Sequence, residues 1–130
     1  MLCHENGALL IFDEVVDGFR FGIGGAQAYF GVTPDLSTFG KAAANGMPLS
    51  IVAGRKEIME AVDKKIFIST TFGGECLSLA AGIAVMHELR HRDVTKRIWA
   101  IGEKLQTTFR QLAEQIGVPI DLAGYLAGCH

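Results

Sequence analysis

The sequence predicts an α/β domain with a mostly parallel sheet and flanking helices. Two observations predict it. Short apolar runs of strand length lie between glycine-rich or charged stretches in the first half of the chain, and two long helical patterns fill most of the second half. With 130 residues, 49% of them hydrophobic, and a net charge of −2, the chain suits one modest domain and is not disordered.

Four segments are predicted as strands. Ala8–Phe12 is an apolar run that ends abruptly at two carboxylates, which is typical of a strand buried on both faces of a parallel sheet. In such sheets ligands gather at the carboxyl ends of the strands, and Asp13 and Lys41 both follow predicted strands. The other three candidates are Leu36–Phe39, Leu49–Ala53 and Ile66–Ile68.

The segments between the strands are predicted from their glycines and their periodicity. Asp17–Pro34 is rich in glycine and is expected to be a loop with a short helix. Within it, Gly22–Gly25 is too short and wrongly placed for a dinucleotide fingerprint, so it is interpreted as a turn. Glu57–Val62 has the spacing of an amphipathic turn.

Two helices are predicted in the second half. The first begins near Glu75 and is apolar almost all round, so it is expected to be buried. The second spans 94–116, with Asp93 as a cap and Gly117 and Pro119 marking its end. Trp99 lies off its apolar stripe, where it either packs on a partner subunit or stays partly exposed. No element is assigned to residues 120–130.

Charge, cysteines and the amino terminus restrict the class of protein. Twelve basic against 14 acidic residues lack the basic excess of a nucleic-acid binder. The 3 cysteines are widely spaced, which argues against a disulfide framework and favours a reducing compartment. Residues 1–12 have neither the charge pattern of a signal peptide nor the length of a membrane span. We therefore expect a cytoplasmic protein with no nucleic-acid or membrane partner.

Several motifs occur in a characteristic order: LIFDEVVDGFR at 10–20, QAYFGVTPD at 27–35 and FGKAAANGMP at 39–48, followed by Gly54–Met59 and Thr71–Gly82. On these motifs the chain resembles the class III pyridoxal-phosphate (PLP) aminotransferases, and most closely their glutamate-1-semialdehyde 2,1-aminomutase branch. The resemblance covers residues 8 to about 92 well. It implies part of the large domain of the PLP-dependent transferase fold (fold type I).

The resemblance also implies a domain division and an activity. Residues 1–93 would be a partial PLP-binding large domain, 94–117 a connector helix and 118–130 the start of a small C-terminal domain. In the family, the loop that grips the phosphate and the aromatic residue that stacks on the ring lie upstream of the first strand, so an internal fragment is expected. The implied reaction is transamination or amino-group migration on a small amine or carbonyl compound, such as an amino acid or amino-aldehyde.

The family pattern assigns roles to four residues. Asp13 would contact the pyridine nitrogen and favour its protonated form, which makes PLP a better electron sink; the alternative is a surface or capping aspartate. Lys41 would hold PLP as a Schiff base and then transfer protons as general base and acid; the alternative is a solvated lysine, which its apolar neighbourhood argues against. Val15 would pack on the ring, or is an ordinary core valine.

Thr71 would complete the set. It precedes Gly73 and Gly74 and a predicted helix start, where a hydroxyl and free N–H groups suit a phosphate. In the family the matching threonine reaches the phosphate of the neighbouring subunit's cofactor, which implies a homodimer. Glu75 and Cys76 stand where the branch commonly has Asn-Pro, and Asp17 stands in place of a usual threonine, so the substrate stays open.

Two alternatives remain. His87-Glu88-Leu-Arg-His91 matches the H-E-x-x-H signature of zinc metallopeptidases, with Glu88 as base and Glu114 as a conceivable third ligand. Arg90 and Arg92 argue against zinc through their charge, and favour a charged last helical turn that complements the helix dipole. The other alternative is a noncatalytic chain that acts only by association with full-length subunits.

Overall fold

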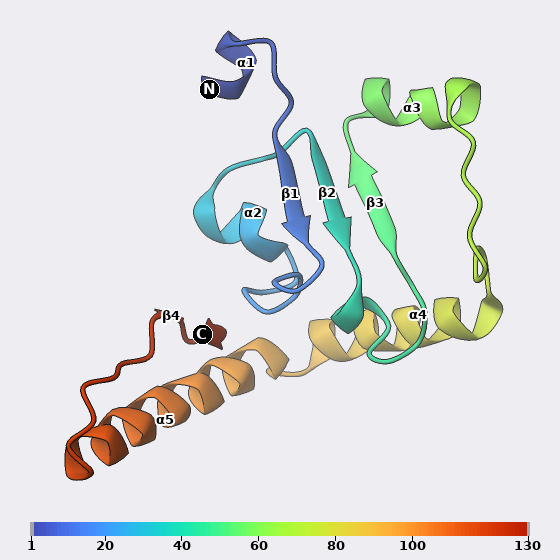
Figure 1. Ribbon diagram of the computed structural model, residues 1–130. Helices are drawn as coiled ribbons and strands as arrows, with labels where there is room; N and C mark the ends of the chain where they lie inside the picture. Colours follow the sequence, from blue (N-terminus) through green and yellow to red (C-terminus); the bar gives the residue numbers. More distant parts are fainter. Residues whose placement is uncertain (1, 130) are drawn as a thin grey trace.

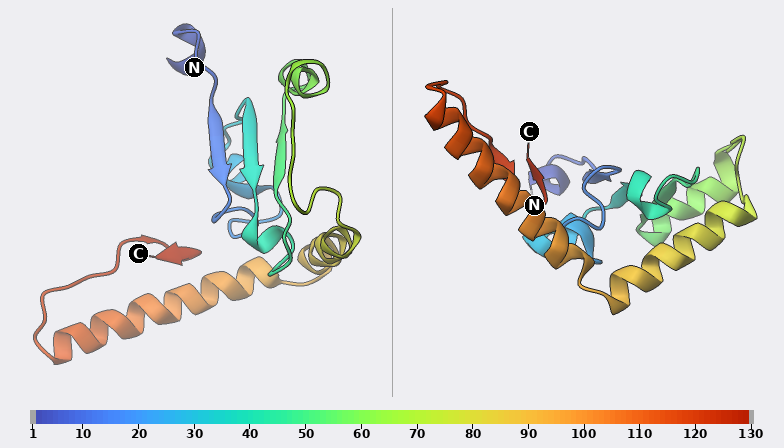
Figure 2. Two further views of the ribbon diagram at one scale, coloured as in Figure 1. Left: turned by 45° about the vertical axis from the view of Figure 1, so that its right-hand side comes forward. Right: turned by 90° about the horizontal axis from the view of Figure 1, so that it is seen from below.

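A three-stranded sheet forms the centre of the structure (Figure 1). The computed structural model describes residues 2–129, without the side chains of 63, 64 and 129. The strands are β1 (Ile11–Glu14), β2 (Leu36–Phe39) and β3 (Ile51–Gly54), in that order across the sheet. The short helix α2 (Gly25–Phe30) lies on one face, and the opposite face is open (Figure 2).

The α/β class is confirmed. The directions of the three strands determine which strand ends lie together. β1 and β2 are parallel, with Asp13 opposite Thr38, whereas β2 and β3 are antiparallel. One ladder of each kind results because the chain crosses from β1 to β2 through α2, but turns back into β3 soon after β2 ends. The carboxyl-terminal ends of β1 and β2 therefore lie next to each other at one end of the sheet, here called the carboxyl edge.

The strand predicted at Ile66–Ile68 is wrong. This segment belongs to no strand of the described chain, and its three side chains are 54%, 91% and 63% exposed. Its apolar residues satisfy a strand pattern, but no described strand lies beside it to accept its backbone hydrogen bonds.

The helices agree better with the sequence pattern. The predicted turn at Glu57–Val62 lies within a longer helix, α3 (Lys56–Lys65), while α4 spans Cys76–His91 and α5 spans Val94–Gln115. Gly117 has a φ of +69° just beyond α5, as its role as a stop signal requires. The short helix α1 (Leu2–Glu5) and the 3-10 turn η1 (Lys41–Ala43) complete the helical elements among the described residues.

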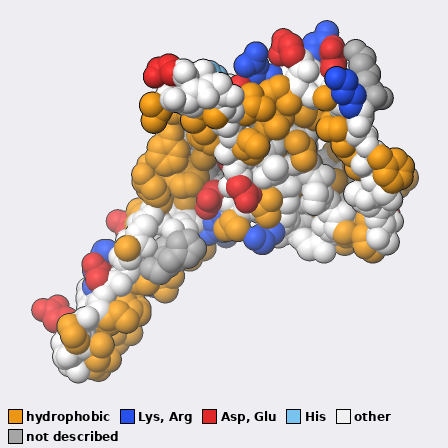
Figure 3. Space-filling view, turned by 45° about the horizontal axis from the view of Figure 1, so that its top comes forward, with side chains coloured by type: hydrophobic (Ala, Val, Ile, Leu, Met, Phe, Trp, Pro, Cys, Tyr) orange, Lys and Arg blue, Asp and Glu red, His pale blue; other side chains and the backbone are white. Residues whose placement is uncertain are grey.

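Two details of the helix predictions need correction. Asp93 occupies the N-cap position of α5, but its side chain makes no capping hydrogen bond. The prediction that α4 is buried is also wrong, since Leu77, Leu79 and Ile83 are 62%, 45% and 73% exposed. Apolar composition shows what a helix face can bury, and no described element covers these faces. Figure 3 shows hydrophobic side chains over much of the visible surface.

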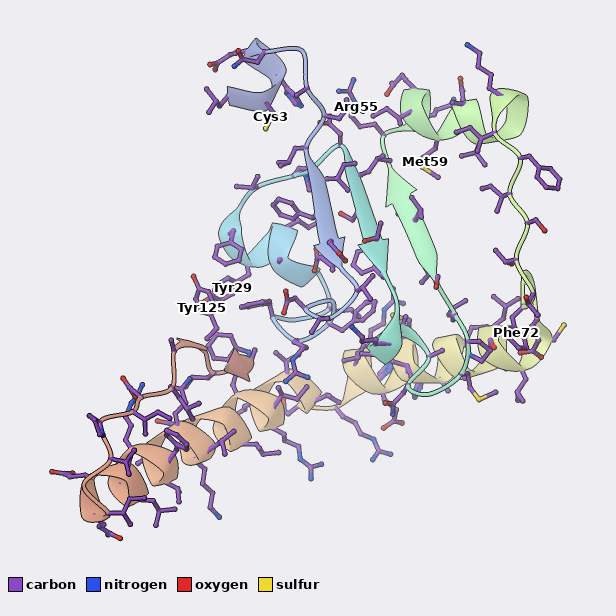
Figure 4. The ribbon with its side chains drawn as sticks, viewed as in Figure 1. Cys3, Tyr29, Arg55, Met59, Phe72 and Tyr125 are labelled. Carbon is purple, nitrogen blue, oxygen red and sulfur yellow. The ribbon has the colours of Figure 1, made fainter. Side chains whose placement is uncertain are left out.

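The unassigned tail folds back as a hairpin onto α5. Its strands β4 (Gly124–Tyr125) and β5 (Gly128–Cys129) are antiparallel. Tyr29 and Tyr125 lie together in Figure 4, and Trp99 joins them in an aromatic cluster with Phe21. Trp99 Nε1 also donates to the Arg20 carbonyl at 3.0 Å. In this structure Trp99 therefore packs within its own chain.

The buried carboxylate of Asp35 connects three segments at the amino end of β2, through hydrogen bonds from His4, Leu10 and Arg55. Asp35 is 2% exposed and accepts hydrogen bonds from Leu10 N at 2.7 Å, His4 Nε2 at 2.8 Å and Arg55 Nη1 at 3.1 Å. The Leu10 amide first, then His4 and Arg55, lower the pKa of Asp35 from 3.8 to about 2. The stabilisation of the fold by the Asp35 carboxylate is complete above pH 3.8 and is lost as the pH falls through about 2.

Among residues 2–129, no helix is both long and apolar enough to cross a membrane.

Gly102 tests how the hairpin is held. A Cβ at this buried position of α5 would collide with the Leu126 carbonyl oxygen and lie 2.6 Å from its carbon. We expect Gly102→Ala to destabilise the fold by about 1–3 kcal/mol in urea unfolding. The fluorescence of Trp99, the single tryptophan, should report a loosened hairpin.

The control for this prediction is Glu103→Ala, at the exposed neighbouring position on α5. It should change stability by less than about 0.5 kcal/mol. Equal effects of the two substitutions would contradict close packing between the hairpin and α5.

Candidate active site

The carboxyl edge shared by β1 and β2 brings the predicted site residues together. Asp13 lies near the end of β1, opposite Thr38 of β2. Directly after β2, Gly40 leads into η1, which begins at Lys41. β1 and β2 point the same way (Figure 1), so Asp13, within β1, and Lys41, just after β2, lie toward the same end of the sheet.

Local hydrogen bonds orient Asp13. Its Oδ1 accepts from Val15 N at 3.0 Å and from Thr38 Oγ1 at 3.2 Å. The side chain is exposed and points to the face of the sheet opposite α2, because Glu14, the next residue, points toward α2. Asp13 can therefore present its carboxylate to a group on the open face.

Lys41 stands on a strained turn. Its φ is +42°, and those of Asn45 and Gly46 are +46° and +108°. A left-handed conformation at a residue other than glycine costs on the order of 1–3 kcal/mol, and such strain is found most often at functional sites. Buried Ala43 and Ala44 pack beneath the turn. The apolar neighbourhood of Lys41 in the sequence argued against a solvated side chain, but among the described residues this side chain is exposed.

Close packing connects the two strand ends and α4. A Cβ at Gly40 would lie 3.4 Å from Val15 Cγ1, so half-buried Val15 packs against the residue before Lys41. Gly82 of α4 approaches Leu49 and the carbonyl oxygen of Ala43, with 2.9 Å and 3.5 Å between these atoms and an added Cβ. The small residue at Gly82 therefore lies where α4 approaches η1, and an added Cβ would require the Leu49 side chain to shift.

Lys41 and Thr71 line one cleft of about 470 Å³. Its other lining residues are Met47, Pro48, Leu49, Ser50, Thr70, Phe72, Gly73 and Gly74. Phe72 lies near the start of α4 (Figure 4). Asp13, in β1, and Val15, directly after it, do not line this cleft.

The amino terminus of α4 differs from the expected phosphate site. Glu75 accepts hydrogen bonds from Leu77 N, Ser78 N and Ser78 Oγ, each at 2.7 Å. The hydroxyl of Ser78 first, then the two amides, lower the pKa of Glu75 below its ordinary value of 4.5. The prediction of free N–H groups here is therefore wrong for Leu77 and Ser78, because the chain's own carboxylate occupies them.

The geometry of the H-E-x-x-H segment does not favour zinc. The His87 and His91 rings stack with centroids 4.2 Å apart, and His91 Nδ1 lies 2.8 Å from the His87 carbonyl oxygen. Glu88 pairs with Arg92 at 2.7 Å. The part of the chain that the structure describes brings no three His, Cys, Asp or Glu side chains together as a metal site. The arrangement favours a charged last turn.

Glu14 is a buried carboxylate to which the sequence motifs assign no role. The structure buries it to 2% exposure beneath the open edge, on the α2 side of the sheet. A signal was present in the sequence: two consecutive carboxylates on a strand must point to opposite faces, so one of them faces the covered side.

The cap on α4 can be tested by substitution. We expect Glu75→Ala to lower the melting temperature and to speed hydrogen exchange at Leu77 and Ser78. Because the pKa of Glu75 is lowered on folding, its stabilisation is complete above pH 4.5 and declines as the pH falls through the lowered value. Wild type and Glu75→Ala should converge in acid; a constant difference down to pH 2 would contradict the charged cap.

Comparisons with known proteins give the family. A sequence model described as aminotransferase class III matches residues 1–126. The glutamate-1-semialdehyde 2,1-aminomutase of Methanosarcina acetivorans is 40% identical over 95% of this chain and 30% of its own length. That of Alkaliphilus oremlandii is 46% identical over 85% of this chain and 27% of its own. The chain thus spans about 30% of the curated relatives that it matches.

Solved structures agree. The PLP internal aldimine form of the Sphingopyxis FumI protein superposes with a TM-score of 0.86, at 29% identity over 96% of this chain and 30% of that one. An omega-transaminase from Sphaerobacter thermophilus gives a TM-score of 0.83, at 31% identity over 95% of this chain and 29% of that one. The fold is that of the PLP-dependent transferases, fold type I, and class III aminotransferases use PLP. The chain belongs to the class III aminotransferase family.

Proposed function

We propose that this chain supplies Lys41, Asp13, Val15 and Thr71 to the PLP site of an aminotransferase or aminomutase. The observation that carries the proposal is the shared carboxyl edge of β1 and β2, which brings Asp13 and Lys41 out side by side. The residues fit the cofactor. The exposed amine of Lys41 lies in a cleft of about 470 Å³ that is also lined by Thr70 and Thr71, and the exposed Asp13 carboxylate lies on the open face of the sheet.

Each residue has a distinct task. PLP, when bound, withdraws electrons from the substrate carbon that carries the amino group. Lys41 Nζ would hold the cofactor covalently as a Schiff base and, once released, take and return the substrate's proton. Asp13 would keep the ring nitrogen protonated. Val15, against Gly40, would pack on the ring beside Lys41. Thr71 Oγ1 would donate to the phosphate of the cofactor held by the partner subunit.

The proposal covers both amino-group transfer and amino-group migration on a small amine or carbonyl compound. Both reactions need the same covalent hold, proton transfer and charge at the ring nitrogen. Relatives named for each reaction resemble this chain. We further propose cytoplasmic activity as a homodimer. In the proposed division, residues 1–93 bind the cofactor, α5 lies in the connector at 94–117, and 118–130 begin a small domain.

Covalent labelling tests the leading proposal. The chain is mixed with PLP, reduced with borohydride and mapped by peptide mass spectrometry. We expect close to one label per chain, on Lys41, and only background in Lys41→Arg, which keeps the positive charge. Asp13→Asn should weaken PLP retention about tenfold or more, as expected for loss of a hydrogen bond to a charged group.

Label spread over several surface lysines, unchanged in Lys41→Arg, would contradict the proposal. If such a chain still associated with full-length class III subunits, the noncatalytic alternative would be supported. Zinc bound stoichiometrically by wild type and lost in His87→Ala would support the peptidase alternative.

A mixing experiment tests the homodimer and the role of Thr71 across it. Lys41→Arg and Thr71→Val chains are labelled separately and after exchange of subunits. If Thr71 serves the partner's cofactor, the mixed dimer has one site with both Lys41 and Thr71, so labelling of the Thr71→Val chain should rise toward half of its sites. No gain on mixing would contradict a contact across subunits.

A further inference from the structure

Glu14 is a buried carboxylate with an incomplete set of partners. It is 2% exposed, and its Oε2 accepts from Ala26 N at 2.7 Å. Its Oε1 is buried and has no hydrogen-bond partner among the described residues. Gly25, with a φ of +66°, lies against it: a Cβ there would be 2.8 Å from Oε1 and would collide with Oε2. The chain gives up a side chain at this position to admit the carboxylate.

Such a group is costly for a fold. Burying a carboxylate oxygen without a donor costs more than burying an apolar group of the same shape. Stability alone would favour a hydrophobic side chain between β1 and α2. A role for Glu14 should therefore be sought in what its hydrogen bonds hold in place.

Those bonds close the loop that follows Asp13. The Glu14 carbonyl accepts from Gly18 N at 2.9 Å, and the Glu14 side chain holds Ala26 at the start of α2. The segment 15–25 is thus attached to Glu14 at both ends: near its start through the Glu14 backbone carbonyl, and just after its end through the Glu14 side chain. Val15, the first residue of that loop, donates its N–H to Asp13 Oδ1 at 3.0 Å and packs against Gly40.

We propose that Glu14 is a positioning residue for Asp13: by fastening the loop 15–25, it keeps the Val15 N–H on the Asp13 carboxylate and aims that carboxylate at the open face. Its importance for PLP binding rests on the proposed function. Its action on Asp13 does not, and can be measured without cofactor.

Hydrogen exchange followed by NMR on the cofactor-free chain tests the mechanism. We expect Glu14→Ala to speed exchange at Val15 N–H about tenfold or more, as loss of a buried hydrogen bond of about 1.4 kcal/mol implies. Glu14→Gln keeps an oxygen for Ala26 and should stay near wild type. The matched control is Gln106→Ala on α5, which removes another buried polar side chain that donates to a backbone carbonyl, here Gly124 O of the hairpin at 3.2 Å rather than a group bonded to Glu14.

A double-mutant cycle on PLP retention adds a measurement that a merely structural role would not change. If Glu14 acts through Asp13, Glu14→Ala weakens retention in the wild-type background but has little effect in the Asp13→Asn background. Gln106→Ala should have the same effect in both backgrounds.

The outcomes are distinct. Faster Val15 exchange in Glu14→Ala, recovery in Glu14→Gln and a non-additive cycle support the proposal. Unchanged Val15 exchange, an equal rise in Gln106→Ala, or an additive cycle overturns it. If wild type retains no PLP on Lys41, the proposed function fails, and the exchange comparison alone decides the role of Glu14.

Discussion

The register of the parallel β1–β2 ladder is the constraint on which the candidate site depends. Asp13 lies opposite Thr38, which leaves Gly40 and Lys41 just beyond the end of the neighbouring strand. A slip of one residue would exchange the faces of Asp13 and Glu14, because side chains alternate along a strand. The carboxylate offered to the open face would then be buried under α2, and the buried one would be exposed. The same backbone pairing therefore fixes both the fold and the identity of the acid at the site.

One face of the sheet is packed against other elements, and the opposite face, which carries Asp13, is exposed. On the α2 side, Glu14 and Ser37 are buried, and the aromatic cluster extends this packing to α5 and the hairpin. On the other side, Ile11 and Val52 are each 55% exposed beside Asp13. The chain spans about 30% of its curated relatives, and its described residues leave this face uncovered.

Local patterns in the sequence predicted what local physics decides. The three- and four-residue spacing of α5 and the glycine after it identified an element that the structure contains. The apolar run before Asp13 identified β1, but this strand continues through Glu14 and its Ile11 is 55% exposed, so the expected burial on both faces was wrong. The pattern failed where the answer depends on a neighbour. Ile66–Ile68 has the composition of a strand but no strand beside it, and α4 is apolar but uncovered. The hydrogen-bond donors to Asp35 come from positions 4, 10 and 55. The Glu75 side chain accepts hydrogen bonds from backbone amides that were expected to be free. Neither arrangement has a periodic signature. The site residues were suggested by motif order, and the fold accounts for the common edge of Asp13 and Lys41.

We propose that Asp13 and Lys41 hold opposite ends of one flat cofactor. The ¹⁵N NMR shift of PLP labelled at its ring nitrogen and bound to this chain tests this arrangement directly. We expect a protonated ring nitrogen at neutral pH that becomes unprotonated in Asp13→Asn while the cofactor stays on Lys41. A ring nitrogen that is unprotonated in the wild-type chain, or that stays protonated in Asp13→Asn, would contradict this arrangement of Asp13 and Lys41.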